Sequence, residues 1–335
     1  NSLKYYSDVA SYWITEYKID GWRFDQCYQL AGGEYNSGKN QNTGGKNYWY
    51  DIRKVVESAA ASNGTKGQDW GTLGYMVGED WDGNQQTLQA SVVSQRGSKG
   101  YGLNSCFDFP AYYQVIQGFA QEWDGKTTNN ITTALSYLYK TYDQKGYSCK
   151  DDDGSYDEYY PNFMLTNHDL YRIGDLIQKK FSCGYDNAQY VGRNKVLLAA
   201  QCAYSGPITI YYGDEIAARS ADNSNGGGWY PDNVARSSGK ISGFNNWEKQ
   251  VHDFTQKCLQ ARAEHPALWK GSNTQVVGQA DFYVAKKVSG SETIYVAFNY
   301  STSEKSFSAS GTDLISGESF NGTVKVPALS ARYIL

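Results

Sequence analysis

The chain has 335 residues and a formal net charge of −4, which is long enough for one large domain and a small one. A pI near 5.5 excludes the basic surface of a nucleic-acid-binding protein, and apolar runs such as 196–203 are too short to span a bilayer. The 30 tyrosines and 9 tryptophans suit a surface that stacks on sugar rings, although any secreted protein with tyrosine on its outside has a similar composition.

Helices and strands alternate through the first 270 residues. Apolar positions repeated every three to four residues predict helices at 9–17, 48–61, 111–123, 131–142, 194–203 and 250–263. Short apolar runs that end in polar residues predict strands at 19–25, 75–79, 103–109, 162–167 and 208–212. Because strands that alternate with helices pair in parallel, this part of the chain is predicted to be an α/β domain.

The character of the sequence changes after Lys270. Short alternating runs separated by Ser, Gly and Asn predict strands at 282–286, 293–299, 305–308, 323–326 and 331–335. This pattern is typical of a small antiparallel β domain. We therefore expect two domains, residues 1–270 and residues 271–335.

Three of the predicted parallel strands end in acidic residues, namely Asp25, Glu79 and Asp169, the last preceded by His168. A single Asp after a strand is most often the cap of the next turn. Carboxylates at the C-terminal ends of several parallel strands, however, converge on the mouth where barrel enzymes hold their active sites. Two carboxylates on either side of a glycosidic bond suffice to hydrolyse it.

Several stretches that contain these residues resemble signature segments of the α-amylase family (glycoside hydrolase family 13). Three of its four signatures are matched in order and rough spacing by GWRFD at 21–25, VGEDW at 77–81 and FMLTNHD at 163–169. The segments YYGDE at 211–215 and PDN at 231–233 are similar to the family's sequence at and after its last barrel strand. The resemblance extends over essentially the whole chain.

The resemblance implies a role for each of these residues. Asp25 is expected to be the nucleophile, with Arg23 on the same strand face pairing with it and holding it ionised. Glu79 is expected to be the general acid/base, which requires a partly desolvated carboxyl. Asp169 is expected to bind sugar hydroxyls and favour the distorted ring, with His168 hydrogen-bonding beside it.

Aromatic residues near these motifs are candidates for stacking on sugar. Trp81, Tyr28 and Trp229 are the three candidates, and plain packing is an equally good interpretation for each. Where the family commonly has a Lys-His pair that contacts the sugar beyond the cleaved bond, this chain has Tyr28 and Gln29. We therefore make no prediction of specificity on the leaving-group side.

The family fold implies a (β/α)8 TIM barrel of which this chain contains only about strands 4–8, followed by a small antiparallel β-sandwich. The family's first signature and the three strands before Ile19 have no counterpart in this sequence. We expect the missing N-terminal half of the barrel to belong to a longer protein or a separate chain. That half commonly supplies the ligands of a Ca²⁺ ion, so we assign no metal ligands here. An open half-barrel exposes its strand edges, and the isolated 335 residues are therefore expected not to fold stably.

The expected function is hydrolysis, with retention, of α-1,4-glucosidic bonds in starch or maltooligosaccharides. Two alternatives remain open, an α-glucan transglycosylase that uses the same carboxylates and a non-catalytic glucan-binding or assembly protein on an amylase scaffold. An exported, extracellular location is expected, although the first residues have no signal-peptide pattern. Cys27, Cys106 and Cys202 lie in or beside apolar segments and are predicted to be buried thiols.

Overall fold

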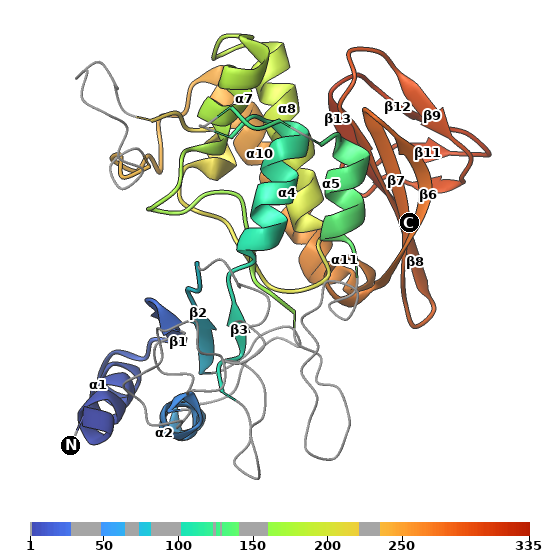
Figure 1. Ribbon diagram of the computed structural model, residues 1–335. Coiled ribbons are helices and arrows are strands. Elements are labelled where there is room, and N and C mark those ends of the chain that lie inside the picture. The colour runs from blue at the N-terminus through green and yellow to red at the C-terminus, as the bar shows by residue number, and fades with distance from the viewer. Residues whose placement is uncertain are drawn as a thin grey trace, which may run out of the picture. The chain divides into compact units, whose positions relative to one another are not determined.

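The structure is a computed structural model that describes residues 2–27, 48–63, 74–81, 102–122, 125–127, 129–140, 160–220 and 235–335 (Figure 1). The chain divides into two compact units. Unit 1 contains residues 1–110 and 142–162, and unit 2 contains residues 111–141 and 163–335. Each unit is described by itself. None of the described helices is both long and apolar enough to cross a membrane.

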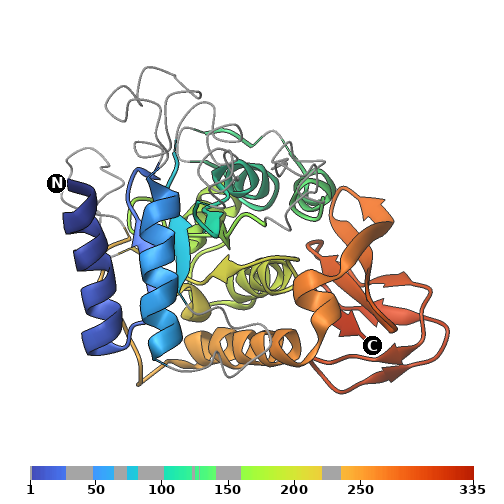
Figure 2. The same ribbon diagram turned by 90° about the horizontal axis from the view of Figure 1, so that it is seen from below.

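Unit 1 is built on a parallel sheet in the order β1 (Gly21–Phe24), β2 (Tyr75–Gly78), β3 (Ser105–Cys106). The register places Phe24 opposite Gly78 and Gly78 opposite Cys106. An isolated parallel bridge joins Phe107 to Asn162. The helices are α1 (Ser2–Tyr17) and α2 (Trp49–Ser62), which lie side by side in Figure 2. Parallel strands need a crossover connection between them, and α2 lies in the connection from β1 to β2.

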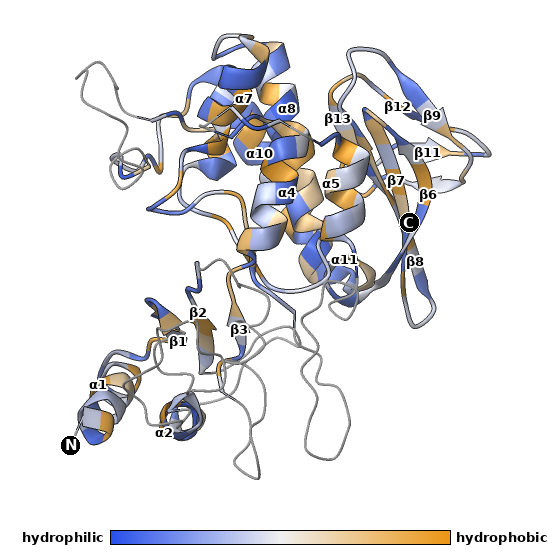
Figure 3. Cartoon of the chain, in the orientation of Figure 1, coloured by the Kyte–Doolittle hydropathy of each residue, from blue (hydrophilic) through white to orange (hydrophobic). Residues whose placement is uncertain are grey.

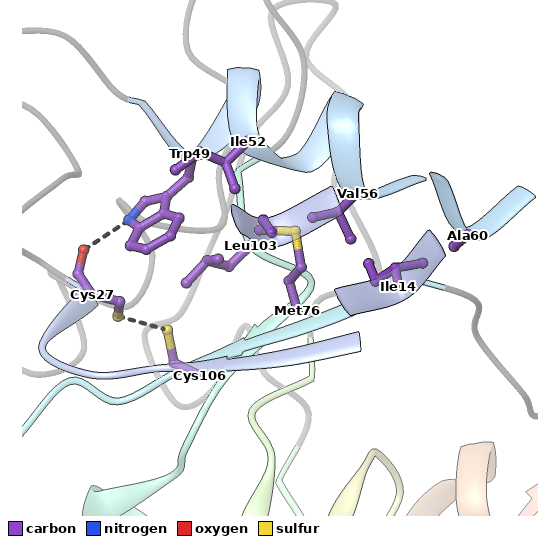
Figure 4. Close-up of a cluster of buried hydrophobic side chains, with 10 residues drawn as sticks. Ile14, Cys27, Trp49, Ile52, Val56, Ala60, Met76, Leu103 and Cys106 are labelled. Atoms are coloured by element: carbon purple, nitrogen blue, oxygen red, sulfur yellow. Dashed lines mark hydrogen bonds between the residues drawn. The ribbon is translucent and has the colours of Figure 1, made fainter. Parts of the chain in front are cut away.

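The core of unit 1 lies between these helices and the sheet (Figure 4). Met76 is fully buried on β2, a strand that is mostly hydrophobic along its length (Figure 3). The indole N–H of Trp49 on α2 donates to the carbonyl oxygen of Cys27 at 2.7 Å. Cys27 and Cys106 are fully buried, with their sulfur atoms 3.9 Å apart, as the sequence predicted for these thiols. This core therefore supports the segment that follows β1.

Unit 2 contains a second parallel pair, β4 (Phe163–Met164) with β5 (Ile208–Thr209). The helix α4 (Phe109–Phe119) begins at the end of unit 1 and continues into unit 2. The other described helices of unit 2 are, in chain order, α5 (Ile131–Leu138), α7 (Ile173–Phe181), α8 (Ala188–Cys202), the 3-10 helix η4 (Asp214–Ile216), α10 (Asn246–Glu264) and α11 (Pro266–Lys270). Asn187 and Asn245 cap the N-termini of α8 and α10 with their side-chain oxygens, as Asn does at this position.

The end of the chain forms antiparallel strands. The largest sheet has the order β13-β8-β7-β6, and the strands are β6 (Ser272–Gln279), β7 (Phe282–Ser289), β8 (Glu292–Asn299), β9 (Lys305–Phe307), β10 (Gly311–Thr312), β11 (Ser319–Phe320), β12 (Val324–Val326) and β13 (Ser330–Ile334). Two buried tyrosine hydroxyls join the sheet region to helices, Tyr333 to the carbonyl of Ala199 at 2.5 Å and Tyr300 to that of Phe119 at 2.8 Å.

The predicted α/β class with a C-terminal antiparallel sheet is confirmed. All five predicted strands of the first part are present and pair in parallel, although the ladders are shorter than the apolar runs. The strand expected at 103–109 ends at Cys106, because Phe109 already begins α4. The sequence analysis did not predict α7, α11 or the strands β6, β10 and β11.

Candidate active site

The first group of candidate residues follows β1. Arg23 lies on the strand and Asp25 comes immediately after it, and their side chains form an ion pair of 2.8 Å between Nη1 and Oδ1. Gly21 begins the strand where a Cβ atom would lie 2.0 Å from the carbonyl oxygen of Tyr75, so only glycine lets β1 approach β2 this closely. The side chain of Asp25 is 71% exposed and can meet a ligand from solvent.

Glu79 follows β2, and hydrogen bonds join it to the segment after β1. Its backbone N–H donates to Phe24 at 2.7 Å, and its carbonyl oxygen accepts from the N–H of Cys27 at 2.8 Å. The N–H of Gln26 donates to Oε2 of the Glu79 side chain at 2.9 Å. The backbone next to Asp25 therefore contacts the Glu79 carboxyl. Glu79 is only 6% exposed.

The backbone just before Glu79 is closely packed against Cys27 and Leu103. A Cβ atom on Gly78, just before Glu79, would lie 2.4 Å from the Cys27 sulfur and 2.6 Å from Leu103. Burial raises the pKa of the Cys27 thiol well above its ordinary value, and the adjacent Cys106 thiol adds to this shift. A thiol that stays protonated is a poor nucleophile, so Cys27 serves packing in this group.

Trp81 is two residues beyond Glu79. Its ring stacks on the ring of Phe109 with centroids 4.8 Å apart and planes 11° apart, and it remains 38% exposed. One face of Trp81 is therefore a packing surface. The other two candidates for stacking, Tyr28 and Trp229, lie outside the described residues.

The second group of candidates lies in unit 2, in the turn after β4. The backbone N–H of Asp169 donates to the side-chain oxygen of Asn167 at 2.8 Å, which fixes the turn. His168 Nε2 lies 3.1 Å from Asp169 Oδ2. Arg236 Nη2 lies 2.9 Å from the other oxygen, Oδ1.

Arg236 was not singled out from the sequence. It comes three residues after the PDN segment at 231–233, which is the signal that could have found it, while its partner Asp169 is 67 residues away. A charge pair at that separation leaves no periodic trace in the sequence. Residues 31–46 and residues 221–234, which include the PDN segment, lie outside the described residues.

A buried ion pair supports this second group. Arg172 and Asp214 are each 1% exposed at the side chain, with Arg172 Nη1 3.8 Å from Asp214 Oδ1. Burial raises the pKa of Asp214 to about 7, and the opposing effect of Arg172 is smaller. The guanidinium donates instead to the backbone oxygens of Tyr212 and Ala235 at 2.5 and 3.0 Å.

Among the described residues, no three or more His, Cys, Asp and Glu side chains gather in a way that could hold a metal ion. The candidate residues described in each unit are carboxyl groups, with arginine or histidine beside them. Unit 1 offers an exposed carboxylate paired with arginine next to a buried carboxyl, which is the contrast that acid catalysis combined with nucleophilic attack requires.

Comparison with known proteins identifies relatives across nearly the whole chain. A family model described as alpha amylase, catalytic domain, matches residues 2–309. A cyclomaltodextrinase from Geobacillus thermopakistaniensis is 21% identical over 303 residues, which are 89% of this chain and 40% of that protein. A second cyclomaltodextrinase, from Thermoanaerobacter pseudethanolicus, is 23% identical over 90% of this chain and 41% of its own length. The chain thus spans about 40% of the length of these relatives.

Solved structures resemble the whole chain. The crystal structure of AmyP in complex with maltose has a TM-score of 0.75 and 28% identity, and it covers all of this chain and 67% of its own. The α-amylase from Geobacillus thermoleovorans, complexed with acarbose, has a TM-score of 0.66 and 20% identity, over 99% of this chain and 63% of its own. At that identity the second likeness shows the fold alone.

Proposed function

The chain belongs to the α-amylase family, and on that premise we propose that it is a retaining α-glucan hydrolase that cleaves α-1,4-glucosidic bonds of starch or maltooligosaccharides. The observation that carries this proposal is the hydrogen bond from the Gln26 N–H to the Glu79 carboxyl. It places a buried acid beside the strand end that bears an exposed, arginine-paired carboxylate at Asp25.

The proposed reaction is a double displacement. The Asp25 carboxylate attacks the anomeric carbon while Glu79 gives its proton to the leaving glycosidic oxygen, forming a covalent glycosyl-enzyme. Water then gives a proton to Glu79 and attacks the same carbon, which releases the sugar and frees Asp25. Asp169 and His168 bind the hydroxyls of the sugar ring during both steps. Arg23 pairs with the Asp25 carboxylate and orients it.

The substrate class is supported by the names of the relatives. Maltose is bound in one solved relative, maltotriose in a variant of the same protein, and two relatives are cyclomaltodextrinases. Maltose and maltotriose are α-linked glucose oligomers, so α-glucans are the substrate class that we propose for this chain. Trp81 and Tyr28 are the aromatic residues proposed to contact the glucan.

For the whole protein we propose the family's domain plan. Residues 1–270 belong to the catalytic barrel, with the five parallel strands as strands 4–8 of eight, and residues 271–335 form the C-terminal β domain. We also propose export to the extracellular space and a Ca²⁺ ion whose ligands lie mostly in the N-terminal half of the family's barrel. A lower melting temperature in EDTA that added Ca²⁺ restores is the expected result for the ion.

The test is made on the whole protein, because the isolated 335 residues are expected not to fold stably. Product release from maltoheptaose is measured for the wild type, for Glu79→Gln and for Asp25→Asn, with the anomer followed by NMR. We expect α-anomeric products from the wild type and a loss of at least about 1,000-fold in each variant. Glu57→Gln is the matched control, because Glu57 lies on the outside of α2 and pairs there with Arg53. Glucans longer than the substrate would identify a transglycosylase, and starch binding without release would identify a binding protein.

A further inference from the structure

Both oxygens of the Asp169 carboxylate are engaged by neighbouring side chains. Arg236 Nη2 contacts Oδ1 at 2.9 Å, and His168 Nε2 contacts Oδ2 at 3.1 Å. An ionised carboxylate has about four acceptor positions, so two positions remain for sugar hydroxyls. The two contacts fix the plane of the carboxylate and leave it able to accept from a ligand.

Arg236 makes a second contact in the same turn. Its Nε donates to the backbone carbonyl of His168 at 3.1 Å while its Nη2 reaches Asp169. A planar guanidinium that donates from two nitrogens to two fixed acceptors defines an orientation, which a lysine ammonium with one nitrogen cannot do. Arg236 therefore joins the peptide and the carboxylate of this turn into one rigid group.

The position of Arg236 is itself held by Arg172. Arg172 is three residues beyond Asp169 and its Nη2 donates to the carbonyl of Ala235 and to the hydroxyl of Ser237, at 3.0 and 3.1 Å. These are the residues on either side of Arg236. The rings of Tyr211 and Tyr212 lie 5.0 and 4.8 Å from the Arg172 guanidinium and enclose it. The backbone that presents Arg236 is thus anchored to a buried group.

We propose that Arg236 is a positioning residue for the glycosidic reaction, which holds the Asp169 carboxylate in the orientation that meets the distorted sugar, and that Arg172 acts through it. The inference rests on the role proposed for Asp169. The contrasting role for an arginine at this place is that of a lid, which substrate must displace from Asp169. The two roles predict opposite changes in kinetics.

The experiment measures kcat and KM on maltoheptaose for Arg236→Gln, Arg236→Lys and Arg172→Lys. The side chain of Arg236 is 49% exposed, so Arg236→Gln is expected to keep the melting temperature of the wild type. A positioning role predicts that kcat falls about 10- to 100-fold in Arg236→Gln while KM changes little, since misplacement of a group that acts in the transition state has this effect. Arg236→Lys keeps the charge near Asp169 but not the two-nitrogen orientation, so it is expected to recover only part of the loss.

Lys249→Gln is the matched control, because it removes one positive charge from the exposed face of α10 where Lys249 pairs with Asp253. It is expected to have the kinetics of the wild type. If Arg172→Lys melts near the wild type, its loss of kcat should not add to that of Arg236→Gln in the double variant. If Arg172→Lys does not fold, the kinetics of Arg236→Gln alone decide between the two roles.

The outcomes separate this inference from the proposed function. An active wild type together with full kcat in Arg236→Gln overturns the positioning role alone. A lower KM with equal or higher kcat in Arg236→Gln also overturns it, in favour of the lid. A wild type that releases no sugar overturns the proposed function, and the positioning role falls with it.

Discussion

The backbone N–H of Gln26 donates to the side-chain oxygen Oε2 of Glu79 at 2.9 Å, although the two residues are 53 positions apart. Gln26 directly follows Asp25, so this one bond relates the ends of β1 and β2 and the two carboxyl groups that they carry. The parallel register that places Phe24 opposite Gly78 is what brings the two ends to the same level.

Gln26 has a backbone φ of +41°, in the region that disfavours most side chains. Asn tolerates this region better than Gln, so Gln26→Asn is expected to be at least as stable as the wild type. Gln26→Pro cannot adopt this φ and loses the N–H donor to Glu79. We therefore expect this variant to be less stable by about 3 kcal/mol or more and to lose activity. Urea unfolding of both variants checks this, and a Pro variant as stable as the Asn variant would contradict it.

Gly78 has no room for a side chain. Because a Cβ would lie 2.4 Å from the Cys27 sulfur, Gly78→Ala is expected to cost about 1–3 kcal/mol of stability and to displace the segment beside Glu79. Removing the sulfur in Gly78→Ala/Cys27→Ala should recover part of the loss. Gly239→Ala serves as the control, because its Cβ would meet Tyr212 at an ordinary 3.4 Å. Thermal unfolding of the three variants gives the comparison.

Asp214 gives stability a defined dependence on pH. Burial raises its pKa in the folded protein to about 7 from an ordinary value of 3.8, so the folded state holds a proton that the unfolded state has lost between these values. The contribution of Asp214 to stability is therefore fully present below about pH 4 and is lost as the pH rises through about 7, with a slope of up to about 1.4 kcal/mol per pH unit.

The measurement is the free energy of unfolding in urea between pH 4 and pH 8 for the wild type and Asp214→Asn. The free energy of unfolding of the wild type, relative to that of Asp214→Asn, should be larger at pH 4 than at pH 8. Asp253→Asn, on the exposed face of α10, is the control. Parallel curves for the wild type and Asp214→Asn would rule out a titrating Asp214 in this range.

Lys287 is fully buried on β7, where its Nζ contacts the Ser205 hydroxyl and the Asn273 side-chain oxygen, each at 2.7 Å. Burial lowers the pKa of this amine well below its ordinary value. Since the unfolded chain then binds more protons, the contribution of Lys287 to stability rises with pH up to about 10.5. Lys287→Met keeps the volume and removes the buried amine, so we expect equal or greater stability at pH 7.

Lys287→Ala is the matched variant, because it also removes the amine but leaves a cavity. It is expected to lose about 2 kcal/mol or more relative to Lys287→Met. Urea unfolding at pH 7 and pH 9 measures both effects. A Met variant much less stable than the wild type would mean that the two hydrogen bonds of the amine outweigh its burial.

The sequence by itself determined the order of elements and the candidate carboxylates. The runs at 19–25 and 75–79 are apolar and end in acidic residues, and this local pattern suffices to predict a strand with a carboxyl group at its C-terminal end. In the tertiary structure the parallel strand ladders are shorter than the apolar runs from which the strands were predicted. The tertiary structure also revealed β6, whose largely exposed, polar residues carry no strand pattern, and α7, whose first turn contains Gly174 and Asp175.

Only the tertiary structure decided which groups meet. Arg236 reaches Asp169 across 67 residues, Gln26 reaches Glu79 across 53, and Arg172 reaches the neighbours of Arg236 across more than 60. Each contact depends on strand register and on how loops pack, and neither is encoded in the spacing of residues along the chain. Periodicity reports which face of an element is buried, whereas hydrogen bonds between distant segments follow from the packing of the whole unit.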